Sequence, residues 1–214
     1  MLDYQKRFNK IYRYSYDIPS WSCYPISEDI VGFVKTLLSK GVLKKNSSIL
    51  DVGCGRGRLL VKLEKLGFTN TTGVDISSVA VKYAKNQNRN STIFKADIVK
   101  GLPIPGNTFD LIMDLTMTSS CRPRLWPKIY QEFNRLLKND GHIILEMFIR
   151  PPNTLLSCPL TKKSEKIPDR LDQIFGITNE DVDHIIGRFF TIIKARKSYP
   201  DSLGRYYILA KKTK

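Results

Sequence analysis

The chain has 214 residues, of which 42% are hydrophobic, and its formal net charge is +15 at pH 7. This length predicts one domain with a sizeable core, and the hydrophobic content excludes a globally disordered chain. We expect neither a secretory signal nor a membrane span, because no apolar run reaches the ~20 residues of a transmembrane helix. The four cysteines are widely spaced, which predicts reduced thiols in a cytoplasmic protein rather than a C-x-x-C zinc site.

The positive charge is spread along the chain rather than gathered in one arm. Residues 1–48 carry eight Lys/Arg and four Asp/Glu, residues 49–150 carry fifteen and nine, and residues 151–214 carry twelve and seven. No run of five like charges occurs, as a nucleic-acid-binding arm would show. The even spread favours a solvated lysine-rich surface, with an anionic substrate, a membrane surface or RNA as the alternative partners.

Residues 1–47 predict a helical, aromatic segment in front of the core. Its first apolar side chains fall at i, i+4, i+7 and i+8, as on one face of a short helix: Tyr4, Phe8, Ile11 and Tyr12. The aromatic residues around Pro19 are expected either to pack on the core or to fold over a pocket as a lid. A second helix is predicted over 28–39, with Ser27 as its N-cap.

From residue 48 to residue 148, strands and helices alternate. Strands are predicted over 48–52, 71–75, 91–95, 109–114 and 142–148. Helices are predicted over 58–66, 77–86 and 127–138, and a turn at Asn139-Asp140-Gly141 follows the last of them. This βαβ rhythm predicts a parallel sheet with helices on both of its faces.

The remaining residues, 149–214, predict a loop, a helix and a closing β-hairpin. Four prolines and polar residues over 150–170 predict a long loop. Thr178 and Asp181 have the spacing of a capping box and predict a helix start. The last two strands are predicted over 189–194 and 205–210.

One stretch predicts a ligand at the end of the first strand, and it reads Asp51-Val52-Gly53-Cys54-Gly55-Arg56-Gly57. Glycine has no Cβ, so the backbone can turn sharply there and approach a ligand closely. The helix that follows offers backbone N–H groups and a positive dipole end. The spacing differs from the dinucleotide motif G-x-G-x-x-G, whose third glycine would stand where this chain has Arg58.

Acidic residues follow three later strands, at Asp75, Asp97 and Asp114. Open parallel sheets bind ligands beyond the carboxyl ends of their strands, so these acids are expected near the glycine loop. A carboxylate at Asp75 can accept two hydrogen bonds from a ribose diol. Asp110 begins its strand and is therefore interpreted as structural.

Over residues 48–148 these features resemble the five successive motifs of the class I S-adenosylmethionine-dependent methyltransferases. The resemblance implies a Rossmann-like α/β fold, with a doubly wound seven-stranded sheet that is mostly parallel and has an antiparallel last strand. It implies S-adenosyl-L-methionine as cofactor and no metal. It places the methionine part at Asp51, Gly53, Cys54, Gly55 and Gly57, the ribose at Asp75, the adenine at Ile76, Asp97 and Ile98, and the sulfonium beside Asp114 and Leu115.

The resemblance further implies an enzyme that transfers a methyl group to a small-molecule acceptor by in-line displacement. Asp114-Leu115-Thr116-Met117 stands where amino-methylating DNA enzymes carry an Asn/Asp-Pro-Pro-aromatic motif. No general base is assigned, which is compatible with a thiol, amine or chalcogen acceptor. The alternatives are a protein or RNA methyltransferase recruited by the basic surface and a non-catalytic partner protein.

Four residues are candidates for the acceptor side of the site. They lie in the aromatic N-terminal segment and after the fourth strand, at Tyr16, Trp21, Arg122 and Trp126. Cys54 is interpreted as a small filler, and His142 and His184 as packed or surface residues rather than catalytic ones.

Overall fold

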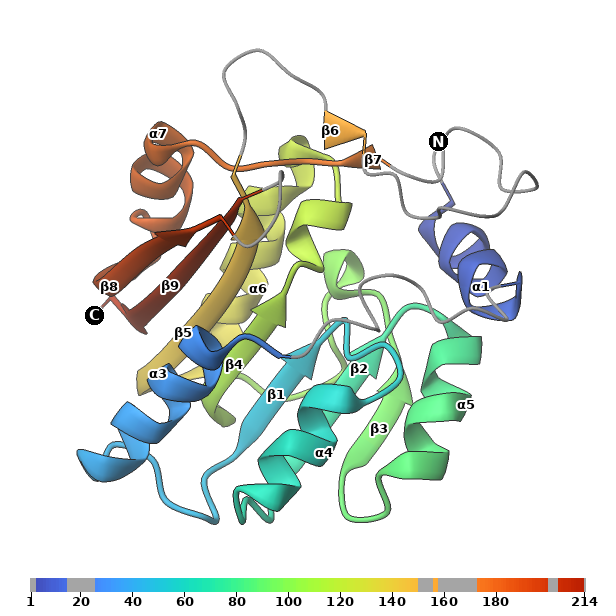
Figure 1. Cartoon of the computed structure of the whole chain (residues 1–214), viewed down its shortest axis with the longest axis horizontal. Coiled ribbons are helices and arrows are strands. Elements are labelled where there is room, and N and C mark those ends of the chain that lie inside the picture. The colour runs from blue at the N-terminus through green and yellow to red at the C-terminus, as the bar shows by residue number, and fades with distance from the viewer. Residues whose placement is uncertain (1–2, 15–25, 150–155, 158–172, 200–203, 214) are drawn as a thin grey trace.

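A computed structural model describes residues 3–14, 26–149, 156–157, 173–199 and 204–213. Its centre is a seven-stranded sheet with the strand order β3-β2-β1-β4-β5-β9-β8 (Figure 1). The strands are β1 (Ile49–Val52), β2 (Thr71–Asp75), β3 (Thr92–Lys95), β4 (Phe109–Leu115), β5 (Leu137–Phe148), β8 (Phe190–Ser198) and β9 (Arg205–Lys212). Pairs among β1 to β5 are parallel, and β9 is antiparallel to both β5 and β8. The predicted sheet with its antiparallel last strand is confirmed.

Helices cover both faces of this sheet, as predicted (Figure 1). Successive strand residues point to opposite faces. Ile49 of β1 therefore packs in the core shared with α3 (Glu28–Ser39) and α4 (Arg58–Lys65), whereas its neighbour Leu50 packs in the core shared with α6 (Trp126–Leu136). A fourth helix, α5 (Ser78–Gln87), contacts β2 and β3. Because the central strands are buried on both faces, their sequences are apolar without alternation.

Local capping signals fix three helix starts. The Ser27 hydroxyl accepts a hydrogen bond from the Asp29 N–H at 3.2 Å, and Ser77 accepts one from Ala80 at the start of α5. A capping box between Thr178 and Asp181 opens α7 (Asn179–Asp181). Such caps satisfy N–H groups that have no partner within the helix, and all three were predicted from the residue types.

Two segments differ from the predictions. α6 ends at Leu136, and β5 begins at the next residue, although the pairing register with β4 shifts before His142. A Cβ on Gly141 would lie 2.9 Å from the Lys138 carbonyl oxygen, so the predicted turn lies inside β5 as a tight irregularity. The predicted loop over 150–170 contains a short strand, β6 (Leu156–Ser157), which pairs with β7 (Gln173–Ile174) beyond the end of that loop.

A helix that precedes the sheet, α1 (Tyr4–Tyr14), confirms the first predicted helix. It contacts α5 and lies beyond the ends of β2 and β3 (Figure 1). Among the helices of the described ranges, none combines the length and apolar content needed to cross a membrane.

Candidate functional site

The parallel strands bring three buried acids to one edge of the sheet. β1 is flanked by β2 and β4, and Asp51 is paired in register with Gly73 on one side and Met113 on the other. Asp75 is the last residue of β2, and Asp114 is the penultimate residue of β4. All three side chains are buried. The strand pairing thus brings these acids together at the carboxyl edge, next to the glycine loop.

The glycine loop between β1 and α4 has three left-handed residues, with φ of +74° at Gly53, +53° at Gly55 and +78° at Gly57. A Cβ on Gly53 would lie 2.5 Å from the Met117 side chain, and one on Gly55 would lie 2.7 Å from the Tyr12 hydroxyl. Gly57 instead faces Ala84 and Asn88 of α5. The first two glycines therefore serve close approach at the site, and the third serves helix packing.

The backbone N–H groups of this loop are largely used within the protein. Gly53 and Cys54 both donate to the Val74 carbonyl oxygen, at 2.8 and 3.0 Å, and Gly57 donates to Cys54 at 2.8 Å. The Gly55 N–H donates to an Asp75 carboxylate oxygen at 2.9 Å. An anionic group bound near this loop would consequently need hydrogen-bond donors from elsewhere.

Asp75 holds the loop and the start of α5 together. Its second carboxylate oxygen accepts the Ser77 N–H at 2.8 Å. Burial raises the pKa of Asp75 to about 6, against the lowering effect of the N–H donors of Ser77, Gly55 and Ile76. A carboxylate has about four lone-pair sites, so these three donors leave Asp75 capacity for about one further hydrogen bond from a ligand.

Asp114 closes the turn that follows β4. Thr116 has φ of +70°, which strains a β-branched residue. This turn brings the Met117 N–H to 2.7 Å and the Thr118 N–H to 3.2 Å from Asp114 oxygens, and the Thr118 hydroxyl also binds there. Burial raises the pKa of Asp114 to about 6 despite these donors. Asp114 is fully buried and acts on the site through the loop that carries Met117.

Asp51 is the least compensated of the three acids. Its side chain is 3% exposed, and its Oδ2 has no hydrogen-bond partner among the described residues. Burial raises its pKa well above the ordinary value, and the charges of Asp75 and Asp114 raise it further. Desolvated carboxylates that repel one another favour a bound cation.

The residues predicted at the adenine and sulfonium ends are only partly brought to this edge. Asp97 caps a 3₁₀ turn over Ile98–Lys100 and accepts the Val99 N–H at 3.0 Å. Ile98 is buried in the core beneath α6, whereas Ile76 is partly exposed next to Asp75. Leu115 packs against the core on the α3 and α4 side.

The four predicted acceptor-side residues have different positions. Trp126 is 1% exposed, and its indole N–H donates to the Thr118 and Cys121 carbonyl oxygens at 2.9 and 3.0 Å, which gives it a structural role under the loop. Arg122 is partly exposed, and its backbone N–H donates to the Tyr4 hydroxyl of α1 at 3.0 Å. Tyr16 and Trp21 lie outside the described residues.

Three residues at this edge were missed by the sequence predictions. Asn9 of α1 binds the start of α5, Tyr12 of α1 contacts Gly55, and Met117 contacts Gly53. The helical period of α1 placed Tyr12 on an apolar face, but nothing in the pattern indicated which surface that face would meet. The strained turn that directs Met117 has no glycine to signal it.

The cysteines and histidines give no sign of catalysis. Cys54 is buried, and its sulfur would lie 3.1 Å from a Cβ on Gly73, as expected for a small filler. Burial raises the pKa of its thiol well above the ordinary value, which disfavours a nucleophilic thiolate. His142 is buried in β5, and His184 is exposed. The described ranges contain no group of three or more potential metal ligands.

Comparison with known proteins shows which families the sequence around this edge is similar to. The family model described as "Methyltransferase domain" matches residues 49–141. Ribosomal protein L11 methyltransferase of Burkholderia thailandensis is 38% identical over 73 residues, which are 33% of this chain and 23% of that protein. The Thermotoga petrophila protein of the same name is 28% identical over 110 residues, which are 50% of this chain and 39% of that protein. The chain thus spans less than half the length of these relatives.

Solved structures share the fold over most of the chain. The 1,6-didemethyltoxoflavin-N1-methyltransferase of Burkholderia thailandensis, solved with its substrate and S-adenosylhomocysteine, has a TM-score of 0.73 at 16% identity. The alignment covers 99% of this chain and 89% of that one. A methyltransferase from Methanosarcina mazei has a TM-score of 0.68 at 19% identity, over 82% and 96% of the two chains. Residues 49–141 are therefore similar to a methyltransferase domain, and the chain has the fold of these methyltransferases.

Proposed function

We propose that this protein binds S-adenosyl-L-methionine at the carboxyl edge of its sheet and transfers the methyl group to a small-molecule acceptor. The observation that carries the proposal is the buried carboxylate of Asp51, whose Oδ2 has no hydrogen-bond partner among the described residues and which lies within electrostatic reach of two further buried acids. The donor's sulfonium and ammonium groups are cationic, and a cation at this edge offsets the repulsion among the three acids.

The residues at the edge fit the parts of this cofactor. Asp51 would hold the donor's ammonium group, and the methionine part would lie beside the turn at Gly53 and Gly55, next to the Met117 and Tyr12 side chains that approach these glycines. Asp75 would accept a hydrogen bond from the ribose hydroxyls with the acceptor capacity that its N–H donors leave. Ile76 and the capped turn that begins at Asp97 would flank the adenine.

The chemistry comes from the donor, whose sulfonium makes its methyl group electrophilic. The protein's task is to align an acceptor atom with the methyl carbon and the sulfur, and such positioning supplies several kcal/mol of a barrier. Asp114 would serve this task by fixing the loop that places Met117 against Gly53. An acceptor such as a thiolate or a neutral amine needs no base for the displacement itself.

A small-molecule acceptor is supported by the position of α1 and by the fold comparison. α1 lies at the carboxyl edge, with Tyr4 bound to the loop after β4 and Tyr12 in contact with Gly55. The 1,6-didemethyltoxoflavin-N1-methyltransferase, which aligns with nearly the whole chain, was solved with bound 1,6-didemethyltoxoflavin. Arg122, next to the Tyr4 contact, is our candidate for binding the acceptor.

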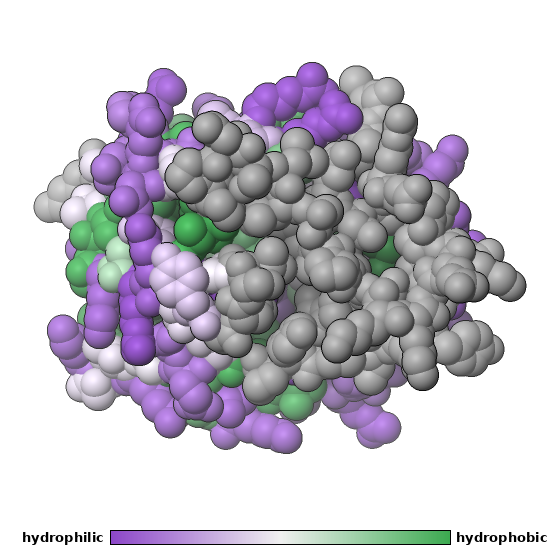
Figure 2. Space-filling view, turned by 45° about the horizontal axis from the view of Figure 1, so that its top comes forward, coloured by the Kyte–Doolittle hydropathy of each residue, from purple (hydrophilic) through white to green (hydrophobic). Residues whose placement is uncertain are grey.

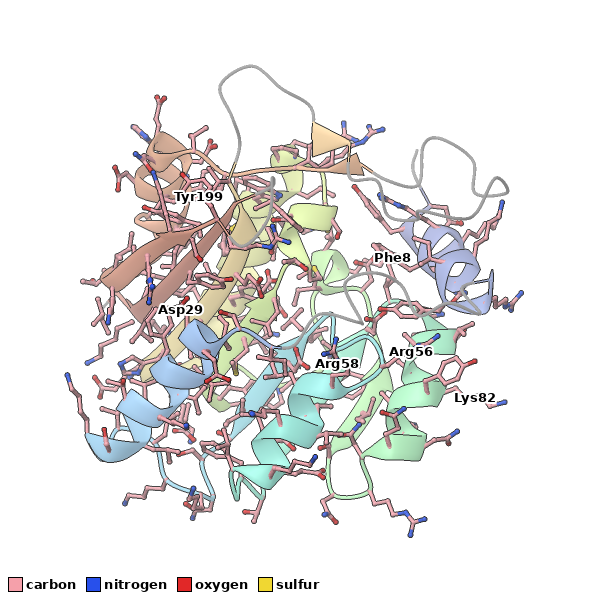
Figure 3. The ribbon with its side chains drawn as sticks, in the orientation of Figure 1. Phe8, Asp29, Arg56, Arg58, Lys82 and Tyr199 are labelled. Carbon is pink, nitrogen blue, oxygen red and sulfur yellow. The ribbon has the colours of Figure 1, made fainter. Side chains whose placement is uncertain are left out.

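A protein or RNA acceptor is the second candidate, and a basic face favours it. Arg56 and Arg58 lie at the start of α4, and Lys82 lies on α5 (Figure 3). The Arg56 guanidinium lies 4.6 Å from the ring of Tyr83, which is 42% exposed. In the part of the surface drawn in colour in Figure 2, hydrophilic side chains predominate. Basic side chains beside an exposed aromatic ring are typical of surfaces that bind nucleic acid.

Calorimetry with S-adenosylhomocysteine tests the donor site first. Binding is expected, and failure of the wild-type protein to bind either this product or the donor would favour the non-catalytic partner protein. A screen of thiols, amines and carboxylates for S-adenosylhomocysteine release then tests the acceptor class. Turnover of a small molecule with little salt dependence supports the main proposal. Turnover only of RNA or protein, with affinity that falls steeply as salt rises, supports the second candidate.

The proposed location is the cytoplasm, where a reducing environment keeps free thiols such as the buried Cys54 and Cys121 reduced. Fractionation of cells that express the tagged full-length chain checks this location. Recovery in a membrane or secreted fraction would contradict it.

A further inference from the structure

Two residues of α1 bracket the acid proposed to bind the ribose. Asn9 and Tyr12 are three positions apart, so they lie on the same face of the helix. Asn9 contacts Ser77 and Tyr12 contacts Gly55. Ser77 and Gly55 are the two residues whose N–H groups donate to the opposite oxygens of the Asp75 carboxylate. One helix face therefore covers both sides of Asp75.

Asn9 anchors this helix face. Its Oδ1 accepts hydrogen bonds from the Ser77 hydroxyl at 2.8 Å, the Ser78 hydroxyl at 3.3 Å and the Val79 N–H at 3.5 Å. These donors belong to the first turn of α5 and its N-cap, where an acceptor oxygen is favourable. The anchor fixes α1 in rotation and along its axis, and so fixes where Tyr12 reaches.

Tyr12 reaches the glycine loop. Its hydroxyl lies 2.7 Å, and its ring carbon Cζ 3.7 Å, from the position that a Cβ on Gly55 would occupy. The side chain is only 5% exposed, so the hydroxyl lies in the interior between α1 and the loop. Any larger residue at position 55 would displace this hydroxyl, which gives the absence of a side chain at Gly55 a second reason beside its positive φ.

The loop leaves a need that a hydroxyl donor at this place would meet. The methionine part of the proposed donor ends in a carboxylate, and four N–H groups of the loop are already used by Val74, Cys54 and Asp75. A carboxylate in a desolvated site requires donors. A tyrosine O–H supplies a short, charge-assisted hydrogen bond to such a group.

We propose that Tyr12 binds the methionine carboxylate of S-adenosylmethionine through its hydroxyl, and that Asn9 is a positioning residue that acts through Tyr12. The proposal rests on the proposed function, because it needs the donor to occupy the glycine loop. The matched domain begins at residue 49, so the proposal makes the preceding segment a part of the cofactor site.

The test compares two ligands that differ in the amino-acid part. S-adenosylhomocysteine carries the carboxylate, and 5′-methylthioadenosine keeps the adenine, ribose and thioether without it. In Tyr12→Phe, calorimetry is expected to show roughly tenfold weaker binding of S-adenosylhomocysteine, the effect of one charge-assisted hydrogen bond. Binding of 5′-methylthioadenosine is expected to stay within about twofold of wild type, because the ring is retained.

A double-mutant cycle tests the role of Asn9. Asn9→Ala is expected to weaken S-adenosylhomocysteine binding, and to add little further weakening in the background of Tyr12→Phe, because both changes remove the same contact. Tyr83→Phe, a matched change on α5 at an exposed ring, is the control and is expected to bind both ligands like wild type. Thermal unfolding without ligand verifies that each variant is folded.

The outcomes separate this proposal from the proposed function. Wild-type affinity for S-adenosylhomocysteine in Tyr12→Phe, or an equal loss for both ligands, overturns the assignment of Tyr12 while leaving the donor site in place. Additive losses in the cycle overturn the positioning role of Asn9. If the wild-type protein binds neither ligand, the proposed function fails, and the assignment of Tyr12 fails with it.

Discussion

Asp110 and Asp114 lie at opposite ends of β4, and their surroundings have opposite effects on them. At the amino end, Asp110 accepts bonds from Lys138 at 2.8 Å and from the Ser48 N–H and hydroxyl at 2.7 and 2.8 Å. Burial acts to raise its pKa, but these donors outweigh burial and hold the pKa below its ordinary value. At the carboxyl end, burial raises the pKa of Asp114 to about 6.

The difference separates an acid that is compensated within the fold from three acids at the edge where we propose that a ligand binds. Asp110 has a cationic partner at the surface, so its charge is compensated without anything bound. Asp51, Asp75 and Asp114 are buried at the other edge, where burial and two like charges raise the pKa of Asp51. Buried charges without a cation cost stability, and sites for ligands are where proteins retain them.

Asp75→Ala should produce the largest loss. It removes the proposed ribose acceptor, and we expect cofactor affinity to fall by about a hundredfold or more. The Gly55 and Ser77 N–H groups lose their acceptor as well, at a cost of ~1–3 kcal/mol each, partly offset by the loss of a buried charge. Calorimetry measures the affinity and thermal unfolding verifies the fold. Unchanged affinity would refute the ribose assignment.

Asp110→Ala is the matched control for that variant, at the amino edge of the same sheet. It removes the partner of Ser48 and Lys138, so the free energy of unfolding should fall by ~1–2 kcal/mol. Cofactor affinity should stay within about twofold of wild type. A large loss of affinity here would mean that the two edges are not independent.

Asp51→Asn should change affinity and stability in opposite directions. The amide keeps the shape of the side chain and removes a buried charge whose Oδ2 has no described partner. We expect the ligand-free protein to gain ~1 kcal/mol of unfolding free energy and the cofactor to bind roughly tenfold more weakly. Thermal unfolding with and without S-adenosylhomocysteine measures both changes. A destabilised ligand-free variant would show that Asp51 is compensated in some other way.

The pH dependence should also differ between the edges. Because Asp75 and Asp114 have pKa values of about 6 and the pKa of Asp51 is also raised, cofactor affinity should fall roughly tenfold from pH 7 to pH 5 as carboxylates are protonated. Between pH 4 and 6 the folded state binds these protons more tightly than the unfolded state, so their contribution to stability falls as pH rises. Asp110, with a lowered pKa, contributes the opposite slope and loses its stabilising effect in acid. Calorimetry from pH 5 to 8 checks the affinity, and urea unfolding from about pH 3 to 7 checks the two stability trends. An affinity independent of pH would exclude titration at the site.

The sequence predicted the sheet, the helix starts and the acidic edge because these depend on local signals. Apolar runs, capping residues such as Ser77 and acids after strands each have a meaning within a few positions. The site's inner contacts depend on the tertiary arrangement instead. Gly57 was predicted as the third ligand-binding glycine, but it packs on α5. Trp126 was a candidate for the acceptor side, but it is buried under the loop. Asn9 reaches Ser77 across 68 positions, a distance over which no periodicity is informative.

Thr116→Gly should have the smallest effect, and it tests how the carboxyl edge holds its loop. Thr116 has φ of +70°, a conformation that costs a β-branched residue ~1–2 kcal/mol and that glycine adopts freely. Part of that gain is lost because glycine makes the unfolded chain more flexible, so we expect the ligand-free protein to be stabilised by up to about 1 kcal/mol.

The same substitution should cost activity, because Thr116 directs Met117 toward Gly53 and Thr118 toward Asp114. Glycine also gives position 116 other backbone conformations that threonine rarely adopts, so the loop can leave its present position, and turnover should fall several-fold while cofactor affinity changes less. Urea unfolding and steady-state kinetics with the acceptor found by screening measure the two effects. A variant that is both less stable and fully active would mean that the turn is held by its partners alone, since Glu146 accepts the Thr116 N–H at 2.8 Å in any case.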